Sequence, residues 1–333
     1  MRYCIWNNKG GVGKTFLTYL IATEYASKNP EKEVIVIDMC PQANVSEIIL
    51  GGNGKGQANL EKCFSLDKTI ASYIKKRYSE GKSKLLGYET TFFVKAKDFN
   101  ENLPENIWLL PGDSELDICS GIINYLGGGP ERKSWINSRY LLLDLINSFA
   151  NNSKKEQVYF FDCNPSFAPY TELAIIAANK LIVPCTADNA SIRGLKNIFK
   201  LLYGSKEEEE NQFTQFYEKI IENKITLPVI HRVVQNKSRS HEKNASKVFL
   251  ATLEEMKKTI FNLKSGYKER ISEDEILYNI KDGNTLAAII NHTGKLLNDI
   301  TIGEHEIYDM KAQVSQAQKE VLIEDVRKLV SNL

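Results

Sequence analysis

The chain has 333 residues, of which 42% are hydrophobic and 26% are charged, and a formal net charge of +1. This composition is typical of a soluble globular protein with one large domain or two small ones. The near-zero net charge excludes a global attraction to polyanions. Any nucleic-acid surface would therefore have to come from local clustering of basic residues.

Residues 1–38 predict a strand, a helix and a second strand. The apolar run at residues 3–6 is followed by a glycine-rich segment. Apolar residues then recur at helical spacing and end near Pro30, because proline terminates a helix. Residues 33–38 are typical of a fully buried strand. This order predicts a βαβ unit with parallel strands and a right-handed crossover.

Further strands are predicted along the chain, most of them separated by helical patterns, at residues 106–110, 157–162, 180–185 and 227–234. Alternation of buried strands with helices is typical of a doubly wound α/β fold, with a mostly parallel sheet and helices on both faces. No linker clearly separates two parts, so we expect a single domain over residues 1–333.

Two regions depart from this regular alternation. Residues 51–105 predict an irregular elaboration, with a flexible loop at residues 51–56 and an amphipathic helix at about 66–78. The acidic run at residues 207–210 predicts the solvated start of a helix, because carboxylates suit the positive end of the helix dipole. Helices are also expected at about residues 285–333.

The cysteines and the N-terminus limit the class of protein. The six cysteines, at positions 4, 40, 63, 119, 163 and 185, form no C-x-x-C pair and no zinc-like spacing with the four histidines. Structural disulfides are therefore not expected. The N-terminus lacks a basic region followed by a long apolar stretch, so we expect a cytoplasmic protein without a signal peptide or membrane span.

The segment Lys9-Gly10-Gly11-Val12-Gly13-Lys14-Thr15 lies between the first strand and the first helix. Glycines allow the backbone to wrap around phosphate oxygens, and the helix start presents unpaired N–H groups to them. Lys14 adds a positive charge, and Thr15 a hydroxyl group for Mg²⁺. We interpret the segment as a phosphate-binding loop; the alternative is a glycine-rich turn that merely closes the βα unit.

The loop departs from the common phosphate-binding pattern in an informative way. Asn8 stands where the first glycine is expected, and Lys9 follows it. Residues 9–15 thereby resemble the motif of the ParA/MinD family of deviant Walker-A ATPases, and the chain as a whole is most similar to ParA-type plasmid or chromosome partition ATPases. The resemblance implies ATP as the nucleotide, and a homodimer in which Lys9 reaches the partner's nucleotide.

Two aspartates follow predicted strands at positions where the family has carboxylates. Asp38 opens Asp-Met-Cys-Pro-Gln, which resembles the family's Asp-x-Asp-Pro-Gln motif, and Asp162 opens Asp-Cys-Asn-Pro, which is similar to its Walker-B-like motif. The resemblance implies that Thr15 ligates Mg²⁺ directly and that Asp38 and Asp162 hold the metal mainly through water. The alternative is that each aspartate caps a turn after its strand.

Cys40 is the main departure from the family. It stands where the second aspartate of the motif orients the attacking water, and a thiol lacks a carboxylate's two acceptor oxygens. ATP hydrolysis is therefore expected to be slow, unless Asn44 or a water network positions the water. Phe16 replaces a common second threonine, but its backbone N–H remains available to the nucleotide.

The resemblance also extends to the second half of the chain. Pro184 lies in a family-like strand, and Asn236 matches a strand-end asparagine that reads the adenine edge, for which an amide has both a donor and an acceptor. The alternative for Asn236 is an ordinary turn residue. Residues 281–287 resemble the segment that leads into a C-terminal helix.

Basic residues recur between positions 232 and 270: Arg232, Lys237, Arg239, Lys243, Lys247, Lys257, Lys258, Lys264, Lys268 and Arg270. Such clustering favours contact with phosphate backbones without sequence readout, although lysines on solvated helices are also common. The resemblance implies nonspecific DNA binding by the ATP-bound dimer and a centromere-binding, ParB-like partner. The protein would then be associated with the nucleoid.

Residues 321–330 predict a terminal helix. Acidic residues on its polar face favour packing against the core over membrane targeting of the MinD kind.

These patterns lead to one main hypothesis and two rivals. The main hypothesis is a ParA-type ATP-dependent dimerising switch in plasmid or chromosome partition, with Lys9, Lys14 and Asp38 as its catalytic residues. The first rival is a nucleotide-gated regulatory or effector subunit with little or no turnover, which Cys40 favours. The second is an electron-transfer protein resembling nitrogenase reductase, for which only Cys119 and Cys163 could hold a cluster.

Overall fold

The computed structural model describes residues 1–80, 87–204, 214–238, 247–272 and 275–333, without the side chains of residues 237–238 and 247–250. The strands are β1 (Arg2–Ile5), β2 (Glu33–Met39), β3 (Val94–Lys95), β4 (Ile107–Leu110), β5 (Gln157–Cys163), β6 (Lys180–Cys185), β7 (Val229–Ser238), β8 (Leu277–Lys281), β9 (Gly303–Ile307) and β10 (Met310–Val314). The strands predicted from the sequence are confirmed, with β7 shifted toward the C-terminus.

The α-helices are α1 (Lys14–Lys28), α2 (Asn44–Ile49), α3 (Gly52–Ser65), α4 (Ile70–Ser79), α5 (Leu116–Gly127), α6 (Ser134–Arg139), α7 (Leu141–Asn151), α8 (Pro169–Ala177), α9 (Asn189–Tyr203), α10 (Gln215–Glu222), α11 (Lys247–Gly266), α12 (Asn284–Thr293) and α13 (Gln316–Val330). Short 3₁₀ turns lie at Glu89–Phe92, Ala96–Asp98, Lys268–Arg270 and Leu297–Asp299.

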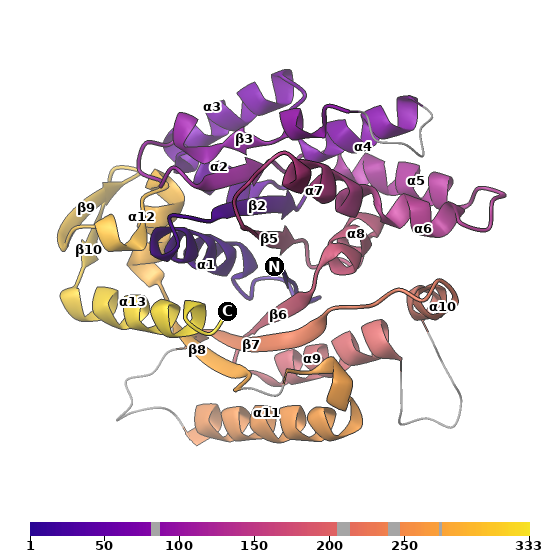
Figure 1. Cartoon of the computed structure of the whole chain (residues 1–333). Coiled ribbons are helices and arrows are strands. Elements are labelled where there is room, and N and C mark those ends of the chain that lie inside the picture. Colours follow the sequence, from indigo (N-terminus) through magenta and orange to yellow (C-terminus); the bar gives the residue numbers. More distant parts are fainter. Residues whose placement is uncertain (81–86, 205–213, 239–246, 273–274) are drawn as a thin grey trace.

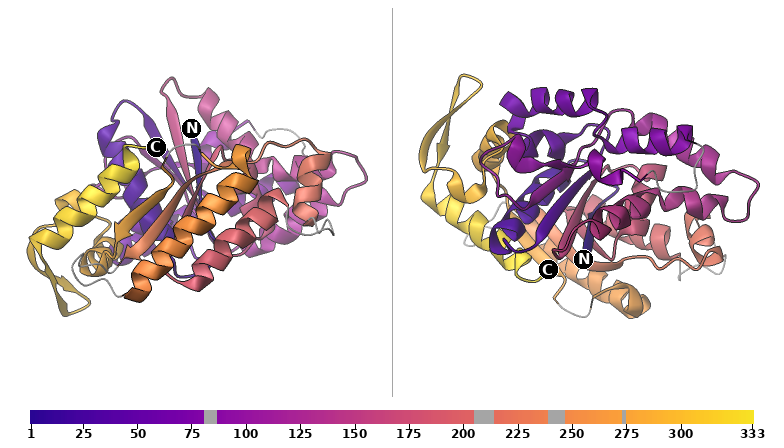
Figure 2. Two further views of the ribbon diagram at one scale, coloured as in Figure 1. Left: turned by 90° about the horizontal axis from the view of Figure 1, so that it is seen from below. Right: turned by 45° about the horizontal axis from the view of Figure 1, so that its top comes forward.

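The main sheet has eight strands in the order β3-β4-β2-β5-β1-β6-β7-β8. All neighbours are parallel except the short edge pair β3–β4. Helices cover both faces, with α1, α2, α3, α12 and α13 on one face and α4, α5, α7, α8, α9 and α11 on the other (Figures 1 and 2). The predicted doubly wound α/β fold is confirmed.

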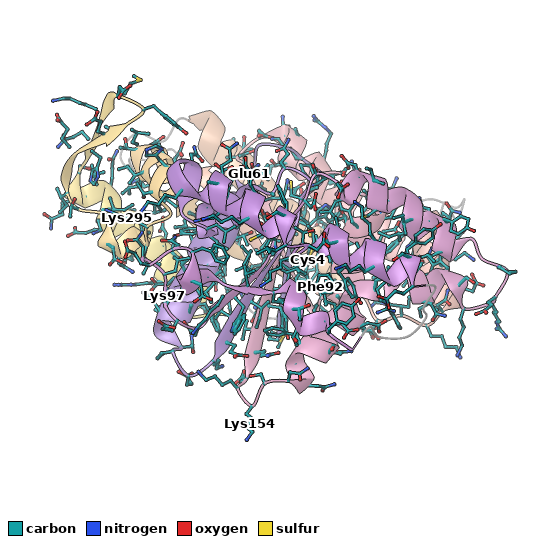
Figure 3. The ribbon with its side chains drawn as sticks, turned by 90° about the horizontal axis from the view of Figure 1, so that it is seen from above. Cys4, Glu61, Phe92, Lys97, Lys154 and Lys295 are labelled. Atoms are coloured by element: carbon teal, nitrogen blue, oxygen red, sulfur yellow. The ribbon has the colours of Figure 1, made fainter. Side chains whose placement is uncertain are left out.

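The sheet separates two apolar cores. Alternate residues of β1 serve both of them: Cys4 packs on the side of α5 and α8, whereas Tyr3 and Ile5 pack on the side of α1. In Figure 3, Cys4 and Phe92 lie inside the layers, and Lys154 projects from the periphery. Because β1 is buried on both faces, the loop that follows it starts from a rigid support.

The prediction of a flexible loop at residues 51–56 is wrong, because helix α3 begins at Gly52. Close packing against neighbouring helices, rather than helix propensity, explains why these residues are helical. A Cβ on Gly56 would lie 2.0 Å from the backbone oxygen of Glu47, and one on Gly52 would lie 2.5 Å from that of His292. The glycines are therefore needed for close approach to α2 and α12. The amphipathic helix predicted from residue 66 begins only at Ile70, after a turn in which Asp67 has φ of 56°.

The C-terminal region was predicted as helices, but it also contains the antiparallel hairpin β9–β10. Tyr308 and Asp309 form its turn with positive φ values of 49° and 61°, which the amino-acid types did not reveal.

The prediction that the terminal helix packs on the core is confirmed, since Leu322, Val326 and Leu329 of α13 are buried against the side of α1. The predicted acidic helix start at residues 207–210 lies outside the described residues; the following helix, α10, begins at Gln215.

Within the described ranges, no helix is long and apolar enough to cross a bilayer.

Candidate nucleotide-binding site

The segment predicted to bind phosphate joins the central strand β1 to helix α1. Gly11 and Gly13 have φ values of 72° and 79°, a conformation that side chains with a Cβ rarely adopt. Val12 between them is fully buried and fixes the loop to the core. The backbone then turns directly into α1, whose first N–H groups point toward the space above the loop.

Lys14 lies inside the loop rather than in solvent. It is 7% exposed, and its Nζ donates hydrogen bonds to the backbone oxygens of Asn7 (3.1 Å) and Lys9 (2.9 Å). Burial lowers the pKa of Lys14, while the nearby Asp162 carboxylate acts in the opposite direction. An anion above the loop would favour the charged form of this ammonium group further.

Two asparagines brace the loop, Asn7 from its own start and Asn236 from strand β7. The buried Asn7 accepts from the Lys9 N–H at 2.9 Å and donates to the Pro184 oxygen at 2.7 Å, which ties the loop to β6. Asn236 of β7 donates to the backbone oxygens of Val12 and Gly13, both at 3.1 Å. Sequence reasoning missed Asn7, although an amide just before a glycine-rich turn is a plausible signal for such a brace.

The two predicted carboxylates are neighbours in the sheet, because Asp38 of β2 is the register partner of Asp162 of β5. Asp38 is fully buried. Its Oδ1 accepts from the Cys40 N–H at 3.0 Å, and its Oδ2 accepts from the N–H (3.0 Å) and the hydroxyl group (2.7 Å) of Ser46. In this structure Asp38 therefore caps the turn into α2, which is the alternative that the sequence had left open.

Asp162 is bonded differently. Its Oδ1 accepts from the Thr18 hydroxyl at 3.0 Å, whereas its buried Oδ2 has no hydrogen-bond partner in the described part of the chain. Burial raises the pKa of Asp162 to about 6; the Thr15 and Thr18 hydroxyls and Lys14 act in the opposite direction. Burial, followed by the Asp162 charge, raises the pKa of Asp38 to about 7.

A divalent cation fits this arrangement. The unpartnered Asp162 Oδ2 is a hard oxygen acceptor beside Thr15, and a cation would favour the charged form of both carboxylates. Among the described residues no cluster of three or more His, Cys, Asp or Glu side chains could hold a metal ion. Mg²⁺ here would therefore need water and phosphate oxygens as its other ligands, which it accepts readily.

The cysteines near the site are buried thiols. Burial, together with the Asp38 charge, raises the pKa of Cys40 to about 12, so the side chain is neutral and cannot act as a carboxylate does. The Cys163 Sγ lies 3.5 Å from the Cys4 Sγ inside the sheet. Cys119 lies inside the core as well, and its Sγ donates to the Ala71 oxygen at 3.7 Å. Neither Cys119 nor Cys163 is exposed to hold a cluster at the surface.

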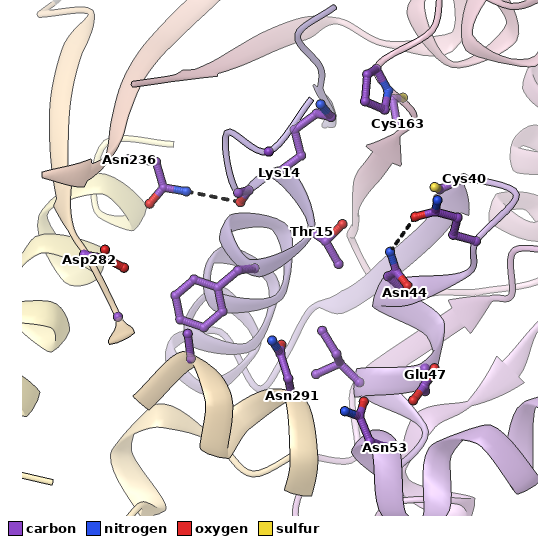
Figure 4. Close-up of a pocket in the computed structure, with 18 residues that line it drawn as sticks. Lys14, Thr15, Cys40, Asn44, Glu47, Asn53, Cys163, Asn236, Asp282 and Asn291 are labelled. Carbon is purple, nitrogen blue, oxygen red and sulfur yellow. Dashed lines mark hydrogen bonds between the residues drawn. The ribbon is translucent and has the colours of Figure 1, made fainter. Parts of the chain in front are cut away.

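A cavity of about 540 Å³ opens above the loop (Figure 4). The predicted nucleotide-binding residues that line it are Gly11, Gly13, Lys14, Thr15, Phe16 and Asn236. Cys40 and Asn44 also line it, whereas Gly10, Val12 and Pro184 do not. Pro184 contributes only its backbone oxygen, through Asn7. The lining residues that sequence reasoning missed include Glu47, Asn53 and Asn291.

Lys9 points away from this cavity, toward the start of α9 in its own chain. Its Nζ lies 2.5 Å from Asp188 Oδ2 and 2.9 Å from Thr186 Oγ1. Burial would raise the pKa of Asp188, but hydrogen bonds from Lys9, Thr186 and the Ser191 N–H bring it to about 2. The lysine that the family motif assigns to a partner's nucleotide is thus held by an ion pair within one chain.

The predicted basic surface is only partly supported. Arg232 is buried: it donates to the backbone oxygens of His231 and Asn332 and lies over the Tyr278 ring, so including it in a DNA surface was wrong. Lys257 is exposed but forms an ion pair with Glu254 at 2.7 Å. Lys258 and Lys268 are exposed as well. Arg239 and Lys243, and the side chains of Lys237 and Lys247, lie outside the described part.

Comparison with known families identifies the chain. The sequence profile of the AAA domain family matches residues 2–215. The chain belongs to this family. Within it the protein is of the ParA/MinD type: a ParA family protein of Mycoplasma genitalium is 24% identical over 207 residues, covering 62% of this chain and 65% of the relative. One of Mycoplasma pneumoniae is 24% identical over 245 residues, covering 72% and 78%. The match thus spans just under two thirds of the first relative's own length.

Solved structures of similar fold cover almost the whole ParA/MinD-type chain. The ATP complex of a Cyanothece McdA variant has a TM-score of 0.61 at 14% identity and covers 99% of this chain and 96% of that chain. The pNOB8 ParA bound to nonspecific DNA has a TM-score of 0.55 at 16% identity, with coverage of 99% and 98%. A putative plasmid partition protein of Borrelia burgdorferi bound to AMPPNP has a TM-score of 0.53 at 17% identity, with coverage of 100% and 99%. At these identities the likeness shows the fold alone.

Proposed function

We propose that this ParA/MinD-type protein is an ATP-dependent switch. The observation that carries the proposal is the buried Lys14 ammonium group inside a glycine-rich loop, at the mouth of a cavity of about 540 Å³. A helix start and a buried cation together favour a phosphate chain. The nucleotide complexes of two proteins with this fold, one with ATP and one with AMPPNP, support the choice of ATP.

Mg²⁺ is proposed as the metal. Thr15 would bind it directly and Asp162 through water, and the bound ion would neutralise phosphate charge. Both carboxylate oxygens of Asp38 accept hydrogen bonds from the turn into α2. The proposed role of Asp38 is to hold residues 40–46 in place and to hold the metal through water, since Oδ1 accepts only one of these bonds and keeps a free lone pair.

The switch is proposed to act through a homodimer. A γ-phosphate can shift the equilibrium only if it interacts more strongly with the closed state than with the open one. Lys9 offers such a difference, because it is paired with Asp188 in the single chain and the family motif assigns it to the partner's nucleotide. The ATP-bound dimer would bind DNA nonspecifically, as pNOB8 ParA does. It would serve plasmid or chromosome partition with a centromere-binding partner.

Light scattering with ATP, ADP or no nucleotide tests this proposal directly. We expect the mass to double with ATP and Mg²⁺ but not with ADP, and the Lys9→Ala variant to bind ATP yet stay monomeric. Binding to a random DNA duplex should appear only with ATP and should fall steeply between 50 and 200 mM salt. A monomer under all conditions, with equal affinity for ATP and ADP, contradicts the proposal.

The alternative is a nucleotide-gated regulatory subunit with little or no turnover, and the neutral thiol of Cys40 favours it. ATP turnover of the native protein should be compared with that of Cys40→Asp and Lys14→Ala. Clear activity in the native protein that is lost in Lys14→Ala rejects the alternative. Activity that appears only in Cys40→Asp supports it, because a carboxylate can then orient the attacking water.

A further inference from the structure

The cavity above the phosphate loop has a wall that the motifs do not explain. It is formed by Glu47 of α2, Asn53 of α3 and Asn291 of α12. In Figure 4 these three side chains lie on the opposite side of Thr15 from Lys14, while Asn236 and Asp282 lie along a different side. The cavity is therefore larger than a phosphate chain needs, and it has polar groups at each end.

The wall depends on the close packing of α3. Gly52 adopts φ of 73° directly against the His292 backbone, and Gly56 lies against the Glu47 backbone oxygen. Side chains at these two positions would push the start of α3 away from α2 and α12. Asn53, between the two glycines, reaches the cavity because both contacts are so close.

Hydrogen bonds join the Asn53 side chain to the Glu47 side chain and to the backbone of Asn291. With the Asn53 amide oriented by its neighbours, its oxygen accepts from the Tyr308 hydroxyl at 2.5 Å. Its nitrogen donates to Glu47 Oε1 at 2.8 Å and to the Asn291 backbone oxygen at 3.1 Å. The hairpin β9–β10, which carries Tyr308, thus supports the wall from outside. Glu47 has no ion-pair partner among the described residues, and its carboxylate borders the cavity.

Neither the phosphates nor the base is expected at this wall. A carboxylate repels phosphate, and Asn236, on a different side of the cavity, is the residue predicted to read the base. The remaining part is the sugar, whose hydroxyl groups both donate and accept. A carboxylate accepts from a hydroxyl group, and an amide donates to it or accepts from it. An acidic side chain binds ribose hydroxyl groups in dinucleotide-binding folds for the same reason.

We propose that Glu47, held by Asn53 and assisted by Asn291, binds the ribose hydroxyl groups and selects ribonucleotides over deoxyribonucleotides. This inference rests on the proposed function, since it assigns the sugar of the nucleotide that the loop binds. Glu47 is a specificity-determining residue, and α3 with the β9–β10 hairpin is the structure that positions it. The elaboration after β2 thereby becomes part of the nucleotide site.

The size of the effect follows from the type of hydrogen bond. A bond between a hydroxyl group and a carboxylate contributes about 1.5–3 kcal/mol, which corresponds to roughly 10- to 150-fold in affinity. The native protein should therefore bind ATP at least about 10-fold more tightly than 2′-deoxy-ATP or 3′-deoxy-ATP. Isothermal titration calorimetry with Mg²⁺ and each of the three nucleotides measures this difference.

The variants separate sugar recognition from general binding. Glu47→Gln should weaken ATP binding by roughly 10-fold or more, and it should change the affinity for the deoxynucleotides by less than about 3-fold relative to the native protein. The preference for ATP over the deoxynucleotides should therefore be reduced. Asn53→Ala should act in the same direction. Glu61→Gln, an exposed acid on the same helix α3, should retain the native preference. Circular dichroism melting curves establish that each variant is folded.

Four outcomes overturn the inference. Equal native affinity for ATP and both deoxynucleotides means that no sugar hydroxyl group is read. A Glu47→Gln variant that keeps the preference, or an Asp282→Asn variant that alone removes it, assigns sugar recognition elsewhere. If the native protein binds no ATP, both the proposed function and this inference are wrong. This result differs from a failure of the inference alone, because none of the three nucleotides then gives a heat of binding.

Discussion

The contact between Gly56 and the backbone of Glu47 gives a sharp test of how α3 is held. An added Cβ at Gly56 would lie 2.0 Å from the Glu47 oxygen and 2.9 Å from its carbonyl carbon. Carbon atoms normally approach no closer than about 3.5 Å at their optimum, so Gly56→Ala must displace α3 or α2 by more than about 1 Å. Overpacking of this kind costs typically 1–3 kcal/mol and sometimes more.

Gly54 offers a matched control two residues away in the same helix. Its added Cβ would lie 3.8 Å from the His292 oxygen, which is an ordinary contact. Alanine is favoured over glycine inside a helix by about 1 kcal/mol. Gly54→Ala should therefore be neutral or stabilising by up to ~1 kcal/mol. Gly56→Ala should be destabilising by about 1–3 kcal/mol, despite the same gain in propensity.

Urea unfolding followed by circular dichroism measures both changes. The midpoint of Gly56→Ala should fall, while that of Gly54→Ala should stay unchanged or rise. Gly56→Ala should also bind ATP more weakly, because Asn53 is withdrawn from the cavity. Equal midpoints for Gly54→Ala and Gly56→Ala would refute the close packing of α3 on α2. An unchanged ATP affinity in a clearly destabilised Gly56→Ala would show that α3 does not shape the cavity.

Three other predictions concern charged groups. Asp188→Asn removes the carboxylate that holds Lys9. It should lower the ATP concentration needed for dimerisation several-fold, as measured by light scattering. An unchanged or higher ATP concentration contradicts this prediction. Burial raises the pKa values of Asp162 and Asp38 to about 6 and 7. The folded, nucleotide-free protein then binds more protons than the unfolded chain, and its stability should fall as pH rises from about 4 to 7. Asp162→Asn should make stability, measured by urea unfolding at each pH, depend less on pH. An unaltered pH dependence argues against the raised pKa of Asp162. Arg232→Ala should cost about 2–4 kcal/mol of stability yet leave the salt dependence of DNA binding unchanged, because the side chain is buried.

The sequence predicted the parts of the fold that short-range patterns determine. Buried strands read as apolar runs, and the run at residues 33–38 became β2 almost unchanged. The loop at residues 9–15 was predictable because a glycine-rich segment between a strand and a helix is a short-range pattern. Its proposed phosphate-binding role rests on that one motif.

The missed features depend on contacts between distant segments. The glycines of residues 51–56 indicate a loop by propensity, and only the backbones of Glu47 and His292 explain why they are helical. The β9–β10 hairpin turns at Tyr308 and Asp309, which are not residues that usually mark such a turn. Asp38 and Asp162 were both predicted to hold the metal through water, which stays a prediction, and only the structure shows how their hydrogen bonds differ. Both Asp38 oxygens accept hydrogen bonds, whereas Asp162 Oδ2 has no partner in the described part of the chain.

The brace from Asn236 has a consequence for communication within one chain. Its amide nitrogen donates to the Val12 and Gly13 oxygens, so a base that accepts a hydrogen bond from this nitrogen would compete with the phosphate loop for the same donor. A nucleoside triphosphate would then occupy the loop and also weaken its hydrogen bonds to Asn236 of β7. Inorganic triphosphate would occupy the loop and leave these hydrogen bonds intact. The two ligands should leave different hydrogen-exchange signatures in residues 11–13, so that the loop reports the presence of the base as well as of the phosphates.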